Sequence, residues 1–245
     1  MKINKAILTG ILGVILVLPA YSVEEDFQKE RPSFDVKEPK ENVLTEKYPS
    51  KESFEENYYL SDDTYKTYKK VTKEPNLVRA LECMKGGLSD FSRKAILGEN
   101  LTLKPVKIEF RDLSELNPAY ADFDALGWKR KNQLYIFVNK KHTNAPPEAL
   151  AALLSHEALH QDEFNSINEE TYCWTLEAAV WTNFTEKNPK LEENVHTLVD
   201  RENTIKKLFL KGNYSDKYIR KSVMTNAGYQ NLPSRSPGFE DIDDL

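Results

Sequence analysis

The chain has 245 residues, of which 40% are hydrophobic and 30% are charged, and its formal net charge is −5. This length suffices for one domain with a buried core, and the acidic balance argues against a nucleic-acid-binding protein, which would carry a basic face. The two cysteines, Cys83 and Cys173, are too few and too far apart for a structural zinc site built on thiolates. In an oxidising compartment they can pair, but the sequence alone does not establish a disulfide.

Residues 1–22 have the three parts of a secretory signal peptide. Lys2 and Lys5 precede an apolar run over residues 6–20, and Ala20 and Ser22 supply the small side chains of a cleavage site. The run is short for a membrane-spanning helix, so the pattern predicts a secreted or periplasmic protein with no stable membrane insertion after cleavage near Ser22. A short membrane anchor that is retained is the alternative.

Residues 23–74 are dense in glutamate, lysine, aspartate and serine, and apolar side chains are sparse. This composition predicts a solvated, flexible arm, and a pro-segment that covers an active site is the sharper alternative. Globular patterning begins near residue 75, so the folded domain is expected over residues 75–245. Within it, residues 213–245 show little periodicity and end in a run of acids, which predicts a loose acidic tail.

The hydrophobic pattern of the domain changes between helical and strand periodicity. Gly127 and Trp128 indicate a loop between two expected strands, and the chain from Pro146 onward is largely helical. The sequence therefore predicts an α+β fold that is mainly helical and has a small β-sheet. The helices expected before residue 146 cover residues 77–84 and 89–97, and the strands cover residues 106–110 and 134–138.

The pentapeptide HEALH, from His156 to His160, is the feature that points most directly to chemistry. In a helix, residues four apart lie on one face, so both imidazoles can bind one metal ion. Glu157 is offset by about 100° and can reach a water molecule on that ion from the side. Pro147 suits the first turn of this helix, and Asn144 is its expected N-cap.

The expected burial of this helix strengthens the metal prediction. A five-residue pattern can arise by chance, and the alternative is a pair of surface histidines on an ordinary helix. On a helical wheel, however, alanine and leucine cover nearly the whole circumference, which is typical of a buried helix. Buried histidine and glutamate side chains are costly without partners, and a metal ion with its water would supply them.

A catalytic zinc ion needs a third protein ligand. The two remaining histidines, His142 and His196, have no spacing that marks them as ligands. The next helix is expected to begin at Ser166, which forms a capping box with Glu169. If that box occupies the Glu169 carboxylate, the neighbouring Glu170 is available to face inward as the ligand.

Two other carboxylates remain open as alternatives for the third ligand. Glu169 and Glu170 both lie in the first turn, where acids also favour the helix dipole. Glu177 points the same way as Glu170 on the wheel. It can be a ligand, or it can accept a hydrogen bond from a ligating histidine.

This combination of residues resembles the zinc metallopeptidases called gluzincins, over about residues 130–185. In that group, HExxH is followed by a glutamate on the next helix, commonly with a small residue three positions later. Cys173 is that small residue if Glu170 is the ligand, whereas Trp174 stands where many members carry an aspartate. The resemblance implies a zincin-like fold, a Zn²⁺ cofactor, a peptide or protein substrate, and Glu157 as the general base.

Two other functions are compatible with the same residues. The domain can be a secreted binding or structural protein that holds zinc on a zincin scaffold without catalysis. It can also be a metal hydrolase that acts on small amides or esters and not on peptides. Access of water to the fourth coordination position and the range of substrates hydrolysed distinguish these alternatives.

Overall fold

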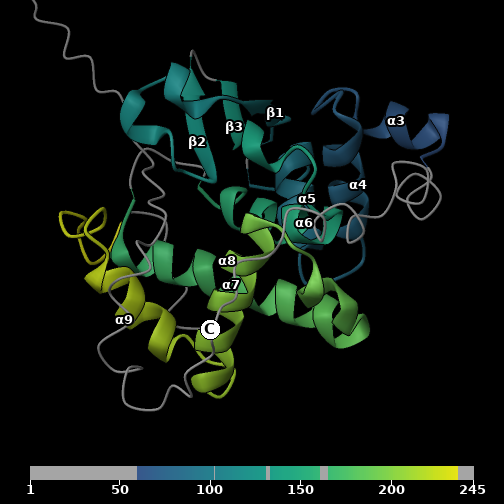
Figure 1. The fold of residues 1–245 in the computed structure, drawn as a ribbon. Helices are drawn as coiled ribbons and strands as arrows, with labels where there is room; N and C mark the ends of the chain where they lie inside the picture. The colour runs from purple at the N-terminus through teal and green to yellow at the C-terminus, as the bar shows by residue number, and fades with distance from the viewer. Residues whose placement is uncertain (1–59, 102, 131–132, 161–164, 237–245) are drawn as a thin grey trace, which may run out of the picture.

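The computed structural model describes residues 60–101, 103–130, 133–160 and 165–236 (Figure 1). The predicted signal peptide lies outside the described residues, as do residues 23–59 of the predicted arm and the acidic end of the tail, residues 237–245. The described residues form an α+β fold in which a three-stranded sheet lies beside a larger group of helices (Figure 1). This confirms the predicted α+β class.

The sheet has the strand order β1-β3-β2, with β1 parallel and β2 antiparallel to the central β3. One face carries Ile108, Ile136 and Val138 into the main core, as the alternation of side chains along a strand requires. The strands predicted near residues 106–110 and 134–138 are confirmed. The bounds are Lys107–Arg111 for β1, Ala125–Arg130 for β2 and Gln133–Asn139 for β3.

The loop predicted at Gly127 and Trp128 is wrong, because both residues belong to β2. Glycine weakens the interior of a strand, so a glycine in the sequence favours a break there. Here Gly127 pairs with Ile136 of β3 and faces the helix that carries the HEALH segment. A Cβ placed on Gly127 would lie 3.8 Å from His160 Cβ, so the strand runs within ordinary contact distance of the HEALH segment.

Helix α6 (Pro147–Glu157) lies at the centre of the fold, and every residue from Ala149 to Glu157 is buried. The prediction of a helix buried all round is thus confirmed. Its N-cap position is Pro146, with no side-chain hydrogen bond, so the predicted cap by Asn144 is wrong. The Ala- and Leu-rich sequence favours helix at every position, and the main core surrounds it.

The N-terminal helices pack beside α6 (Figure 1). The predicted helices correspond to α4 (Pro75–Cys83) and α5 (Asp90–Leu97). A further helix, α3 (Asp62–Tyr68), precedes them, and Tyr68 and Val71 are buried in the main core. The folded domain therefore begins before the predicted boundary at residue 75.

In the described part of the chain, three α-helices follow the HEALH segment: α7 (Ile167–Lys187), α8 (Thr197–Lys211) and α9 (Lys217–Thr225). Helix α7 contacts α6, α8 and α9. Helix α9 and the buried Tyr229 fall where a loose tail was predicted, so that prediction is wrong for residues 217–229. Short 3₁₀ helices cover Leu113–Glu115, Pro118–Tyr120, Lys140–His142 and Pro189–Glu193.

Two further findings concern the cysteines and the lengths of the helices. Cys83 and Cys173 are both free thiols, so the disulfide that the sequence left open does not form. Among the described residues, no helix is long and apolar enough to cross a membrane.

Candidate metal centre

The HEALH segment is helical only in its first part. Helix α6 ends at Glu157, and the chain continues in tighter turns, with Leu159 N donating to His156 O (3.0 Å) and His160 N donating to Glu157 O (3.3 Å). The prediction of one continuous helix through His160 is therefore wrong. The two imidazoles still converge, because their Nε2 atoms lie 3.0 Å apart.

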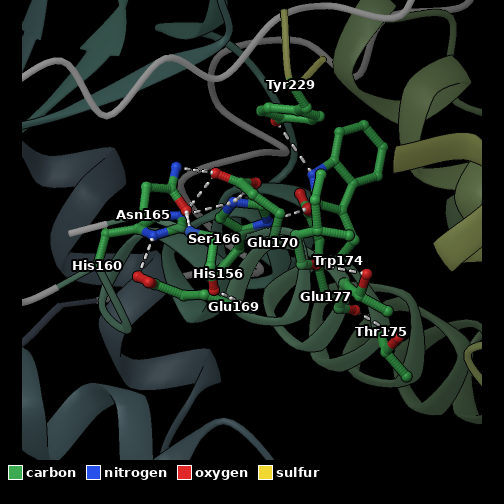
Figure 2. Close-up of polar contacts among 12 residues, drawn as sticks. His156, His160, Asn165, Ser166, Glu169, Glu170, Trp174, Thr175, Glu177 and Tyr229 are labelled. Carbon is green, nitrogen blue, oxygen red and sulfur yellow. Dashed lines mark hydrogen bonds and ion pairs between the residues drawn. The ribbon is translucent and has the colours of Figure 1, made fainter. Parts of the chain in front are cut away.

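Each of the two imidazoles is held on its other nitrogen by a carboxylate of α7 (Figure 2). His156 Nδ1 lies 3.0 Å from Glu177 Oε2, and His160 Nδ1 lies 2.9 Å from Glu169 Oε1. A carboxylate partner favours a proton on Nδ1, which leaves a lone pair on Nε2. At 3.0 Å the two Nε2 atoms can share one proton in a hydrogen bond, or both can bind one cation.

Glu170 presents its carboxylate to the same point. Its Oε2 lies 3.8 Å from His156 Nε2, and its Oε1 lies 3.7 Å from His160 Nε2. Donor atoms bound at about 2.0–2.2 Å to one tetrahedral ion lie about 3.3–3.6 Å apart, so the three side chains fit a single ion with small adjustments. Asn165 Nδ2 donates to Oε1, whereas the buried Oε2 has no hydrogen-bond partner among the described residues.

The predicted capping box forms only in part. Ser166 Oγ accepts a hydrogen bond from Glu169 N at 3.1 Å, as expected. The reciprocal bond is absent from the described residues, because Ser166 N donates to Asn165 Oδ1 and the Glu169 carboxylate turns to His160 and to Ser236 Oγ. Glu169 is thus unavailable as a metal ligand for a reason other than the one predicted.

Cys173 lies one turn after Glu170 on α7 and completes a cluster of potential donors. A nitrogen of His156, a nitrogen of His160 and Cys173 Sγ all lie within 4.8 Å of one another. Burial raises the pKa of the metal-free thiol to about 12. The structure therefore contains a His–His–Cys group that can hold a metal ion, with the Glu170 carboxylate beside it.

Glu157 is buried next to this cluster, and neither of its carboxylate oxygens has a hydrogen-bond partner among the described residues. Burial raises its pKa to about 7, although His156 and His160 act in the opposite direction. A carboxyl group with a pKa near neutrality can both take up and release a proton. Strand β2 passes close by, since a Cβ placed on Gly127 would lie 3.9 Å from Glu157 Oε2.

A buried ion-pair network supports the cluster from behind. Arg201 of α8 binds the Glu177 carboxylate through both terminal nitrogens, pairs with Glu202 (3.0 Å) and reaches Asp124 Oδ2 (3.3 Å). Burial alone would raise the pKa of Glu177, but Arg201 and His156 together lower it to about 2. Glu177 therefore remains an anionic partner for the Nδ1–H of His156.

Several supporting residues were not singled out by the sequence. Arg201 lies on α8 with no motif around it, and its role follows only from the packing of α8 on α7. Arg201 also lies over the ring of Trp174 (4.9 Å), and the Trp174 Nε1–H donates to Tyr229 Oη at 3.4 Å (Figure 2). Ser236 and Tyr229 come from the segment that was expected to be a loose tail.

The two other histidines lie outside the cluster. His142 Nε2 lies 2.7 Å from Asp124 Oδ1, and His196 caps α8 by accepting a hydrogen bond from Leu198 N. They are adjacent to each other, with ring centroids 5.4 Å apart. Their contacts are those of structural histidines.

A pocket of about 220 Å³ lies on the opposite face of the sheet from the cluster. Phe137 and Trp128 line it, and they point away from α6 because Gly127 and Ile136 occupy the inward positions. The remaining lining residues are Glu109, Arg111, Leu116 and Tyr135. This pocket is separated from the metal-ligating side chains by the sheet.

Comparisons with known protein families, with curated proteins and with solved structures gave no match. The donor atoms of this cluster and the carboxylates that orient them are therefore the evidence for its chemistry.

Proposed function

We propose that this protein is a secreted or periplasmic zinc metallopeptidase with a zincin-like fold. His156, His160 and Glu170 hold Zn²⁺, and Glu157 acts as the general base. The observation that carries the proposal is the convergence of the two Nε2 atoms, 3.0 Å apart, while a carboxylate binds each Nδ1. This is the arrangement in which histidine serves as a metal ligand with its tautomer fixed.

The donor set favours zinc over magnesium or calcium. Two imidazoles and one carboxylate suit zinc, whereas magnesium and calcium prefer oxygen ligands throughout. Three protein ligands also leave one position for water, as in catalytic zinc sites. The resemblance to gluzincins agrees with this ligand set.

In the proposed reaction, Glu157 accepts a proton from the attacking water and passes it to the leaving amine. Bound Zn²⁺ would supply polarisation of the scissile carbonyl and a lower pKa for the water. Glu157 is suited to this exchange because its oxygens have no other hydrogen-bond partner among the described residues. Glu177 and Glu169 would hold the two imidazoles in place throughout.

The first experiment measures metal in the purified chain. We expect about one zinc per chain, lost in the His156→Ala, His160→Ala double variant. His196→Asn is the matched control, because asparagine can still cap α8 and the residue lies outside the cluster. An ordered protein that binds no zinc would contradict the proposal.

The second experiment separates binding from chemistry. Glu157→Gln removes the base but keeps the size of the side chain, so zinc should remain at its wild-type stoichiometry while peptide hydrolysis is lost. A peptide library and a panel of small amides and esters are tested in parallel. Cleavage confined to the small substrates would favour the non-peptidase hydrolase.

One observation favours the non-catalytic alternative, a binding or structural protein that holds zinc. His156 and Glu170 have no exposed surface, and the side chain of His160 is only 9% exposed. Closed sites of this kind are typical of structural zinc. Stoichiometric zinc with no hydrolysis of any substrate class would support this alternative.

A further inference from the structure

Cys173 has surroundings that differ from those of an ordinary buried cysteine. Free cysteines commonly fill apolar cores as small hydrophobic residues. Cys173 has no exposed surface, yet its sulfur lies within 4.8 Å of a ring nitrogen of His156 and of a ring nitrogen of His160. Its sulfur therefore faces the polar cluster and not an apolar cavity.

The placement of Cys173 follows from its position on α7. It comes three residues after Glu170, so both side chains leave the helix on the same face. That face meets the end of α6, where His156 and His160 converge. Glu170 Oε2 is also fully buried, has no hydrogen-bond partner in the described part of the chain and lies 3.8 Å from His156 Nε2, which is an independent sign that a cation belongs there.

We infer that Cys173 is a fourth protein ligand, so that the resting site is a His₂GluCys centre for a thiophilic divalent cation. This inference rests on the proposed metal site and adds a ligand to it. On binding, a sulfur–metal bond forms and the thiol proton passes to solvent, as for any cysteine ligand. The sulfur and one nitrogen of each imidazole already lie within 4.8 Å of one another, so the donors have to close in by about 1 Å to bind one ion.

A fourth protein ligand changes the properties of the site in two ways. Thiolate favours zinc and cobalt and disfavours magnesium and calcium. It also fills the position that a catalytic site leaves for water, so thiolate and water compete for one place. The burial of His156 and Glu170 agrees with a closed resting site.

Cobalt(II) provides a direct test, because it substitutes for zinc and reports its ligands in the absorption spectrum. Visible d–d bands report a bound ion, and a near-ultraviolet charge-transfer band reports a thiolate ligand. We expect both in the wild-type chain titrated with cobalt. In Cys173→Ser the charge-transfer band should be lost while the visible bands remain.

Cys83→Ser is the matched control, because Cys83 is the other cysteine of the chain and lies on α4, outside the cluster. This variant should keep the charge-transfer band, and a band that persists there can come only from Cys173. The control thus decides the question even if Cys173→Ser fails to fold. Loss of the band in Cys83→Ser would overturn the inference.

The cobalt spectra distinguish a site that lacks the Cys173 ligand from a chain that has no metal site. Visible bands without a charge-transfer band in the wild-type chain would overturn Cys173 as a ligand and leave the site of His156, His160 and Glu170 intact. A chain that binds no cobalt would contradict both the proposed metal site and Cys173 as a ligand, because Cys173 can be a ligand only if a metal binds.

Discussion

His156 and His160 face each other with their Nε2 atoms 3.0 Å apart, and each ring is fixed from behind by a different glutamate of α7. The rings come from the end of α6 and the following turn, whereas the carboxylates come from one helix packed across them. The candidate metal site is thus formed where α6 and the turn after it pack against α7. Substitutions in α7 that leave every proposed ligand in place should therefore alter metal binding.

The first such change is Glu177→Gln. The amide removes the negative charge that pairs with Arg201 and weakens the hydrogen bond to His156 Nδ1. Arg201 keeps its contacts to Asp124 and Glu202. We expect metal affinity to fall by about 10–100-fold, as is usual when a carboxylate behind a ligating histidine is lost. Competition with a chromophoric chelator measures this change.

Glu186→Gln is the control for this experiment, since Glu186 is an exposed glutamate near the end of the same helix. Its affinity for zinc should match the wild type. Equal affinities in Glu177→Gln and Glu186→Gln would show that the Glu177 carboxylate does not orient a metal ligand.

A second change concerns the C-terminal segment. Ser236 Oγ donates to Glu169 Oε2 at 3.1 Å, and Glu169 in turn holds His160. Ser236→Ala removes a buried hydrogen bond to a charged group, so the free energy of unfolding should fall by about 1–3 kcal/mol. Metal affinity should fall less than in Glu177→Gln, because the contact to His160 itself remains.

Urea unfolding measures this loss, with Ser234→Ala as the control. Ser234 is exposed and contributes its backbone carbonyl, which accepts from Asn168 N at 3.2 Å and survives the substitution. If Ser236→Ala were no less stable than Ser234→Ala, the C-terminal segment would not support the site.

A third prediction tests where the domain begins. Tyr68 has no exposed surface, and its hydroxyl donates to Glu82 Oε1 at 2.6 Å. Tyr68→Ala should lower the free energy of unfolding by about 3–5 kcal/mol, the usual loss for a buried aromatic ring. Tyr68→Phe removes only the hydrogen bond, and it should cost about 0.5–1.5 kcal/mol. Urea unfolding that leaves both variants at wild-type stability would place residues 60–74 outside the cooperative domain.

The sequence predicted those parts of the fold that depend on local periodicity. Residues 149–154 of α6 are all alanine or leucine, and residues 135–138 of β3 are all β-branched or aromatic. Helix α9 and the burial of Tyr229 were missed, because the packing of α9 against α7 that stabilises them is a long-range contact. The local sequence around α9 does not reveal that α7 will pack against it.

The site was predictable in its motif and less so in its supporting residues. His156, Glu157 and His160 follow from one pentapeptide, and Glu170 from its position after the Ser166 cap. The partners of these residues needed three-dimensional information. The Glu169 carboxylate leaves the capping box because His160 and Ser236 come within hydrogen-bonding distance, which local sequence cannot reveal.

Gly127 gives the last prediction, because strand β2 passes at this residue beside Glu157, the proposed general base. A Cβ placed there would lie 3.8 Å from His160 Cβ and 3.9 Å from Glu157 Oε2, an ordinary contact distance. Gly127→Ala should therefore fold and bind zinc. It should be as stable as the wild type or more stable by about 0.5–1 kcal/mol, because alanine loses less backbone freedom in a strand.

Gly127→Val adds two methyl groups beyond that Cβ, where the side chains of α6 already lie. We expect it to be less stable than Gly127→Ala by about 1–3 kcal/mol through overpacking, and to lose peptide hydrolysis because the added methyl groups take the space beside Glu157. Unfolding curves and cleavage assays on the two variants make the comparison. A valine variant as stable and as active as the alanine variant would mean that β2 does not border the reacting groups.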